Sequence, residues 1–237
     1  MERGINKAVN VLDTMVNTVV VIICLLILFI SGYSLLDNMW QVQGASDDSL
    51  LAFKPVLDEP IKQEQLISGN QVAWLTIDDT AIDYPVMRGE DNFEYLNKDP
   101  YGEFKLSGSI FLDHRNSPDF TDEYSVIYGH HMEHGVMFGS LDAFKDKSYF
   151  DTHTKGHLAT GEKVYDITLF AVSSADAMNG TLFDPQGRTT SEITDFLKEN
   201  AIIYNEPEEG RSIIALSTCA GETYYARLLV FGTIKER

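Results

Sequence analysis

An uncharged segment near the N-terminus places the strongest constraint on how this chain can fold. The 22 residues from Met15 to Leu36 contain no Asp, Glu, Lys or Arg, and as a helix they would extend roughly 33 Å, enough to cross a hydrocarbon core of about 30 Å. A cleaved signal peptide is the alternative, but its apolar region is usually only about 7–15 residues long. Gly44-Ala45-Ser46 is no more than a weak cleavage site. We therefore expect a transmembrane helix over residues 15–36.

The basic residues that flank this segment indicate its orientation. Arg3 and Lys7 precede it, and the next basic residue after it is Lys54. Because positive charge in short flanking segments stays in the cytoplasm, residues 1–14 are expected inside the cell and the rest of the chain outside. The sequence thus predicts a single-pass protein of the cell membrane with an extracellular domain.

The composition excludes several partners for that domain. The chain has 36 acidic and 18 basic residues, for a formal charge of −18. A nucleic acid requires clustered Lys and Arg, and an anionic membrane surface would repel such a domain. Hydrophobic residues make up 44% of the chain, enough for a sizeable core. The two cysteines, Cys24 and Cys219, provide no disulfide framework, because Cys24 lies in the expected membrane segment.

Beyond the membrane segment the pattern changes to short helices and then to short strands. Residues 37–70 carry two short helical patterns separated by Pro55 and Pro60, which predicts a juxtamembrane helical region. A capping box of Thr189 and Glu192 begins the clearest helix outside the membrane, residues 190–200. The expected strands cover residues 72–77, 82–87, 109–112, 124–128, 163–175, 212–216 and 228–231. Many short strands with few helices predict a mainly β domain over residues 71–237, a closed β-barrel decorated with short helices.

Three residues suited to thiol chemistry lie at the ends of expected strands. The apolar run 212–216 leads to Cys219, Arg227 begins the next strand, and His130 follows the strand at 124–128. If these strands are neighbours in the sheet, a nucleophile, an acid/base and an oxyanion partner meet, as thiol acyl transfer requires. Cys219 by itself would be more typical of a buried structural thiol. It is His130 and Arg227 that favour catalysis.

These segments resemble class B sortases, the membrane-anchored cysteine transpeptidases of Gram-positive bacteria. Leu216-Ser217-Thr218-Cys219 is similar to the family's Thr-Leu-x-Thr-Cys motif, with Ala215 in place of the first threonine. Tyr128-Gly129-His130 matches the histidine motif, and Arg227 matches the arginine on the following strand. Other similar segments are residues 74–77, 82–86, 91–97 and 108–113 and the helix at 190–200. The order and spacing of these motifs are specific, and the resemblance covers residues 71–237 and the N-terminal anchor.

The resemblance implies a reaction and its partners. Cys219 would cleave a C-terminal sorting signal after threonine and hold the product as a thioacyl enzyme, with His130 as acid/base and Arg227 at the oxyanion or substrate backbone. An amine of lipid II or peptidoglycan, or a pilin lysine, would then take the acyl group, so that a surface protein is joined to the cell wall or to a pilin. No metal or other cofactor is implied. The implied substrate-binding residues are Asn92, Leu96, Ser217 and Thr218, of which Thr218 is chiefly expected to orient the strand end.

Other interpretations of the same residues stay open at this point. A hydrolytic thiol protease would share every catalytic residue, and a non-enzymatic anchored binding domain would keep Cys219 as an unreactive core thiol. A zinc site formed by His130, His131 and His134 would need Cys219 as a further ligand.

The assignment of the arginine is also open. Arg227 could be a structural ion-pair residue, and Arg115 is a competing basic residue in a loop.

Overall fold

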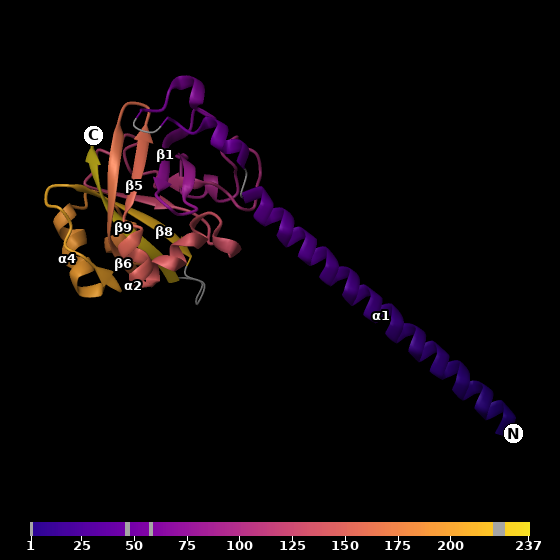
Figure 1. The fold of residues 1–237 in the computed structure, drawn as a ribbon. Coiled ribbons are helices and arrows are strands. Elements are labelled where there is room, and N and C mark those ends of the chain that lie inside the picture. Colours follow the sequence, from indigo (N-terminus) through magenta and orange to yellow (C-terminus); the bar gives the residue numbers. More distant parts are fainter. Residues whose placement is uncertain (1, 46–47, 57–58, 220–225) are drawn as a thin grey trace. The chain divides into compact units, whose positions relative to one another are not determined.

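The computed structural model describes residues 2–45, 48–56, 59–219 and 226–237, and it divides into two units at residues 43 and 44. Helix α1 (Glu2–Ala45) makes up the first unit (Figure 1). Its apolar side chains are exposed, with 73% of Phe29 accessible. The hydroxyls of Thr14 and Thr18 donate to backbone carbonyls one turn earlier, so these polar groups are satisfied within the helix.

Within α1, residues Asn10–Asp37 are long and apolar enough to cross a membrane. This span contains the expected segment 15–36 and extends it at both ends. In the part of the chain that the structure describes, it is the single helix with this property.

The second unit begins with short 3-10 turns that pack on the strands. These are η1 (Asp48–Phe53) and η2 (Gln63–Gln65), in the region expected to form short juxtamembrane helices. Leu50, Phe53 and Leu66 pack against a small buried cluster that includes Trp74 and Ile61. Residues 50–53 and 61–67 of the expected juxtamembrane region therefore contribute to the folded domain, whereas residues 37–45 of that region belong to helix α1.

Eight strands close into a barrel, which confirms the expected fold class. Going around the barrel, the order is β5, β1, β2, β3, β4, β8, β9 and β6, and β5 pairs with β6 to close it; β7 adds to the free side of β6. The strands are β1 (Gln71–Ile77), β2 (Asp83–Met87), β3 (Ile110–Leu112), β4 (Tyr124–Tyr128), β5 (Lys155–Thr160), β6 (Val164–Asp176), β7 (Ile203–Tyr204), β8 (Ser212–Cys219) and β9 (Ala226–Glu236).

The barrel is mixed, and its parallel pairs bring together segments that are far apart in sequence. β2 runs parallel to β3, and β4 runs parallel to β8, while the other pairs are antiparallel. β4 and β8 both have continuous buried runs, with Val126, Ile127, Ile213 and Ile214 fully inaccessible. Such runs are typical of strands covered on both faces.

Short helices lie between the strands in sequence. They are η3 (Glu94–Leu96), η4 (Glu133–Gly135), η5 (Phe138–Lys145), α2 (Lys147–Thr152), α3 (Gly180–Phe183) and α4 (Thr190–Asn200). Among them, α4 contacts β6, while η5 contacts β8 and β9. Helix α4 has the expected bounds, and the Thr189–Glu192 capping box is present at its N-terminus.

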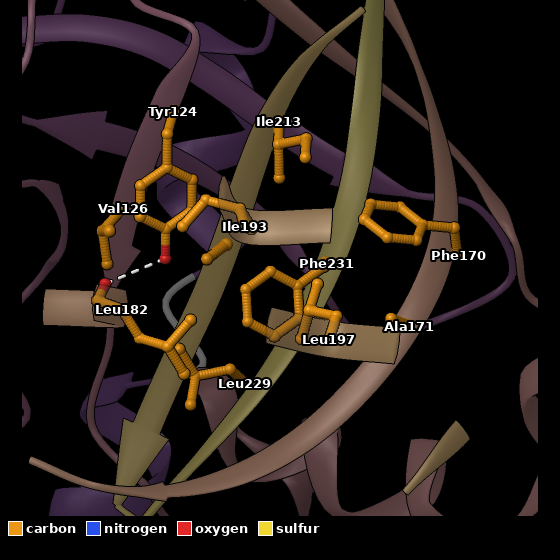
Figure 2. Close-up of a cluster of buried hydrophobic side chains, with 11 residues drawn as sticks. Tyr124, Val126, Phe170, Ala171, Leu182, Ile193, Leu197, Ile213, Leu229 and Phe231 are labelled. Atoms are coloured by element: carbon orange, nitrogen blue, oxygen red, sulfur yellow. Dashed lines mark hydrogen bonds between the residues drawn. The ribbon is translucent and has the colours of Figure 1, made fainter. Parts of the chain in front are cut away.

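A cluster of buried side chains joins α4 and α3 to the strands (Figure 2). Ile193 and Leu197 extend from α4 toward Tyr124 and Phe231, and the Tyr124 hydroxyl donates to the carbonyl of Leu182 at 2.9 Å. Ala215, where the family motif has a threonine, belongs to this cluster and is fully buried. The face of β8 that is turned toward α3 and α4 is thus fixed by packing.

Candidate active site

The strand register brings together the ends of the three strands that carry Cys219, His130 and Arg227. In the antiparallel pair β8–β9, Cys219 lies opposite Arg227. In the parallel pair β4–β8, Tyr128 lies opposite Ser217, and the Gly129 amide continues the pairing by donating to the Ser217 carbonyl at 3.1 Å. His130 comes two residues after Tyr128, and Cys219 two residues after Ser217, so the two backbones reach the same level.

Cys219 is the last residue of β8, and the structure describes its backbone only. Its side chain and residues 220–225 lie outside the described part of the chain. The expectation of a reactive thiol therefore rests on where the strand ends.

His130 is half-buried and is held by one ring hydrogen bond. Its Nε2 lies 2.7 Å from the carbonyl oxygen of Leu96. Because a carbonyl can only accept, Nε2 carries the hydrogen, and this assigns Nδ1 as the nitrogen that can gain or lose a proton. The segment expected to bind substrate thus contacts His130 through its backbone.

Gly129 is required by close packing immediately before His130. A Cβ atom at this position would collide with Ile110 Cδ1 and would lie 2.7 Å from Phe138 Cδ2, both in the buried core. The chain can therefore turn out of β4 at this point only with a glycine, which explains the Tyr-Gly-His order physically.

Arg227 is the second residue of β9, which lies between β8 and β6. It lies opposite Cys219 on β8 and opposite Ala175 on β6, and its Nη1 donates to the Ala226 carbonyl at 3.0 Å. Its side chain is half-buried. A guanidinium at this level can reach an oxyanion formed at the neighbouring strand end.

Asn92 has both ends of its side-chain amide engaged. Its Nδ2 donates to Asp113 Oδ2 at 2.9 Å, and its Oδ1 accepts from the backbone amide of His114 at 2.9 Å. The contacts of Asn92 and Leu96 that the structure describes are with other residues of the protein, and substrate binding by these two residues stays a prediction.

Ser217 and Thr218 are buried, with exposures of 1% and 2%. Their hydroxyls have no hydrogen-bond partner among the residues that the structure describes. Both residues adjoin the part of the chain outside the description, and their roles at the substrate stay predictions.

The other histidines of the alternative zinc site have different surroundings. His131 Nε2 lies 2.7 Å from Asp142 Oδ2, and His134 lies in η4 with a positive φ of 61°. Over residues 2–45, 48–56, 59–219 and 226–237, no group of three or more His, Cys, Asp or Glu side chains is arranged to hold a metal.

A buried carboxylate near the site escaped sequence reasoning. Asp113 is fully inaccessible and accepts hydrogen bonds from Arg115, Asn92 and Tyr128. Burial acts to raise the pKa of Asp113, but the hydrogen bonds from Arg115 and Asn92 outweigh it, so this pKa lies below its usual value. The spacing Asp113-x-Arg115 directly after a strand is the one feature of the sequence that could have indicated this carboxylate. Its other partners, Asn92 and Tyr128, come from distant segments.

Comparison with known proteins identifies the fold and the family. The sortase domain profile matches residues 75–235. Sortase B of Listeria monocytogenes is 33% identical over 186 residues, which cover 76% of this chain and 75% of that protein. A class B sortase of Streptococcus pyogenes, described as involved in pilus biogenesis, is 38% identical with a TM-score of 0.67, covering 79% of this chain and 97% of its own.

A second similar structure contains a small ligand. Sortase B complexed with triglycine is 25% identical with a TM-score of 0.65 and covers 72% of this chain and 82% of its own. The barrel, the matched domain and the relatives agree with one another. The chain belongs to the sortase family and is a class B sortase, a cysteine transpeptidase.

Proposed function

We propose that Cys219, His130 and Arg227 carry out the transpeptidation. The single observation that supports this most is the strand register, in which the ends of β4, β8 and β9 meet at one level with these three residues on them. A free thiol with a pKa of about 8.5 is only partly ionised near neutral pH, so Cys219 needs a base beside it.

The reaction proceeds in two acyl transfers. Cys219 gives its proton to Nδ1 of His130, and its sulfur attacks the carbonyl carbon of the scissile peptide bond. The C–N bond breaks, the leaving amine takes the proton from His130, and a thioester remains on Cys219. A second amine then attacks the thioester carbon and loses a proton to His130. A new C–N bond forms as the C–S bond breaks, and the departing sulfur of Cys219 takes the proton back from His130. Arg227 stabilises the oxyanion that forms in each step.

The first substrate in this proposal is a C-terminal sorting signal cleaved after threonine, and the second is an amine. Family membership supports the first substrate, and the sortase B structure complexed with triglycine supports an amine site. The amine would come from lipid II, from peptidoglycan or from a pilin lysine. The similarity to a class B sortase of pilus biogenesis favours keeping the pilin among these acceptors.

The location follows from the apolar helix. We infer that α1 anchors the chain in the cell membrane, with residues 1–14 in the cytoplasm and the barrel outside. A surface protein that carries a sorting signal would meet the enzyme on that side.

Product analysis tests this function. The unit beginning at residue 44 has its own buried core, so residues 44–237 can be studied alone. They are incubated with a small library of threonine-containing sorting-signal peptides, with and without triglycine, and the products are weighed by mass spectrometry. Joined peptide–triglycine product is expected from the wild type and none from Cys219→Ala. Free acid in both reactions would indicate a hydrolytic protease, and unchanged peptide would indicate a binding domain.

A further inference from the structure

Arg115 lies at the centre of a partly buried hydrogen-bond network that the reaction does not use directly. Its Nε donates to Asp113 Oδ1 at 2.9 Å and its Nη2 donates to Asp113 Oδ2 at 2.8 Å, a bidentate pair with a carboxylate that is fully inaccessible. The hydrogen bond to Asp113 raises the pKa of Arg115, so the guanidinium is charged throughout the working range. Such a pair is directional as well as strong.

One side of the network reaches the segment that contacts His130. Asp113 Oδ2 also accepts from Asn92 Nδ2, which fixes the start of the short segment ending at Leu96. The Leu96 carbonyl is the partner of His130 Nε2 at 2.7 Å. Leu96 ends the single turn η3, which begins two residues after Asn92, so the position of Asn92 limits the position of Leu96.

The other side of the network reaches the end of helix α3, which follows β6, and β6 pairs with the strand that carries Arg227. Arg115 Nη1 donates to Asp184 Oδ1 at 2.8 Å, and Arg115 Nη2 also donates to the Phe183 carbonyl at 2.7 Å. These residues end helix α3, which begins four residues after the end of β6. At that end of β6, Ala175 lies opposite Arg227.

We propose that Arg115 is a positioning residue for transpeptidation, whose guanidinium holds the Asn92–Leu96 segment and the end of α3 at a fixed separation around the catalytic strand ends. This rests on the proposed function of His130 and Arg227. The geometry requires the planar fork, because three nitrogens make four hydrogen bonds in different directions. A lysine ammonium keeps the charge but has a single nitrogen on a flexible stem.

Arg115→Lys in the full chain with Cys24→Ser is the main test, and Arg237→Lys is its matched control. Arg237 also binds an aspartate through its guanidinium, with Nε donating to Asp166, but it follows β9 at the end opposite Arg227. Rates are measured with the library peptide that the wild type cleaves fastest and with triglycine, at a temperature where all variants are folded by circular dichroism. We expect Arg115→Lys to lower kcat at least tenfold with KM changed less than threefold, and Arg237→Lys to stay within twofold of wild type.

A second readout is independent of turnover. The rate of Cys219 alkylation by iodoacetamide is followed against pH, with Cys24 replaced. If Leu96 no longer holds His130, the imidazolium is less stable and helps the thiolate less, so the profile of Arg115→Lys moves to higher pH. A purely structural ion pair would leave this profile unchanged in the folded protein. If the wild-type protein forms no joined product, the proposed function is wrong. The alkylation profiles would still test whether Arg115 positions His130.

Asp184→Asn provides a variant for the case in which Arg115→Lys does not fold. The Asp184 side chain is exposed and accepts from Nη1 of Arg115, whereas Asp113 is bound by Nε and Nη2, so Asp184→Asn removes none of the groups that form the Asp113 pair. We expect a three- to tenfold fall in kcat with an unchanged melting temperature. Full kcat and an unshifted alkylation profile in Asp184→Asn would overturn the proposal, and so would an unshifted alkylation profile in folded Arg115→Lys or an equal loss of kcat in Arg237→Lys.

Discussion

At the scale of single residues, some groups of the site can be recognised in the sequence by their residue type, and others can be recognised only in the folded structure. Cys219, His130 and Arg227 stand out by type and by their places at strand ends. The Leu96 carbonyl does not, because every residue has a carbonyl and only the fold selects the one that faces His130. Asp113 is an intermediate case, since its spacing to Arg115 is visible but its bonds to Asn92 and Tyr128 are not.

Arg227 should contribute to catalysis mainly by stabilising the transition state. Replacing it with alanine should lower kcat by about 10²–10³, the usual loss for an oxyanion donor. Arg227→Lys should be nearly as damaging, because lysine lacks the planar fork. Steady-state kinetics and thermal melts of both variants check this. A rise in KM with kcat preserved would indicate a substrate clamp, and melting temperatures that fall in step with activity would indicate a structural ion pair.

Asp113 should contribute stability in a pH-dependent manner. Its pKa is lowered in the folded state, so its stabilising effect is complete above the unfolded value of about 3.9 and is lost as the pH falls through the folded value. Asp113→Asn should cost about 3–5 kcal/mol at pH 7, as expected when one partner of a buried pair is removed.

Urea unfolding of wild type and Asp113→Asn at pH 7 and pH 3 measures this difference. The gap between the two proteins should shrink at the lower pH. Asp166→Asn is the control, because Asp166 forms an exposed pair with Arg237 and should cost little at either pH. A gap of equal size at both values would show that the charge of Asp113 is not what stabilises the fold.

At the scale of elements, local pattern predicted those strands and helices whose own sequence decides their state. β8 and β9 follow their apolar runs, and α4 follows its capping box. β5 was missed because Gly156 and His157 interrupt its pattern; a Cβ at Gly156 would lie 2.8 Å from the Ile77 side chain, so the glycine serves the close approach of β1. β7 and α3, with two and four residues, are too short to leave a pattern.

The sequence predicted that Cys219, His130 and Arg227 lie close together only on the condition that their strands are neighbours in the sheet. The backbone of His130 reaches the level of Cys219 because β4 and β8 pair in parallel across more than 80 residues of chain. No local pattern indicates that pairing, since both strands simply appear as buried runs. The expectation that these strands lie side by side came from the resemblance to a family and not from the periodicity of the sequence.

The capping box of α4 should contribute measurable stability without affecting catalysis. Thr189→Ala removes the acceptor for the Glu192 amide and should cost about 1 kcal/mol, or roughly 2–4 °C in melting temperature for a domain of this size. Ser in place of Thr189 is the matched variant and should restore most of the loss. Differential scanning calorimetry with a parallel activity assay checks this, and a loss of activity in the folded Thr189→Ala protein would contradict a purely structural role for the cap.

At the scale of the whole molecule, the chain divides into an apolar helix and a catalytic barrel. The full chain should partition into detergent, whereas residues 44–237 should remain in the aqueous phase. The intact mass of the protein isolated from membranes decides between an anchor and a signal peptide. An anchor predicts that residues 15–36 are retained, and an N-terminus at or near residue 46 would show cleavage.

The central claim is that Cys219 carries the acyl group between the two substrates. Intact-protein mass spectrometry of residues 44–237 mixed with a cleaved sorting-signal peptide tests it most directly. The expected result is an adduct equal to the peptide portion up to its threonine, located on Cys219 by fragmentation, which disappears when triglycine is added as the joined product forms. Turnover by Cys219→Ala, or turnover by wild type with no adduct that triglycine removes, would contradict the account.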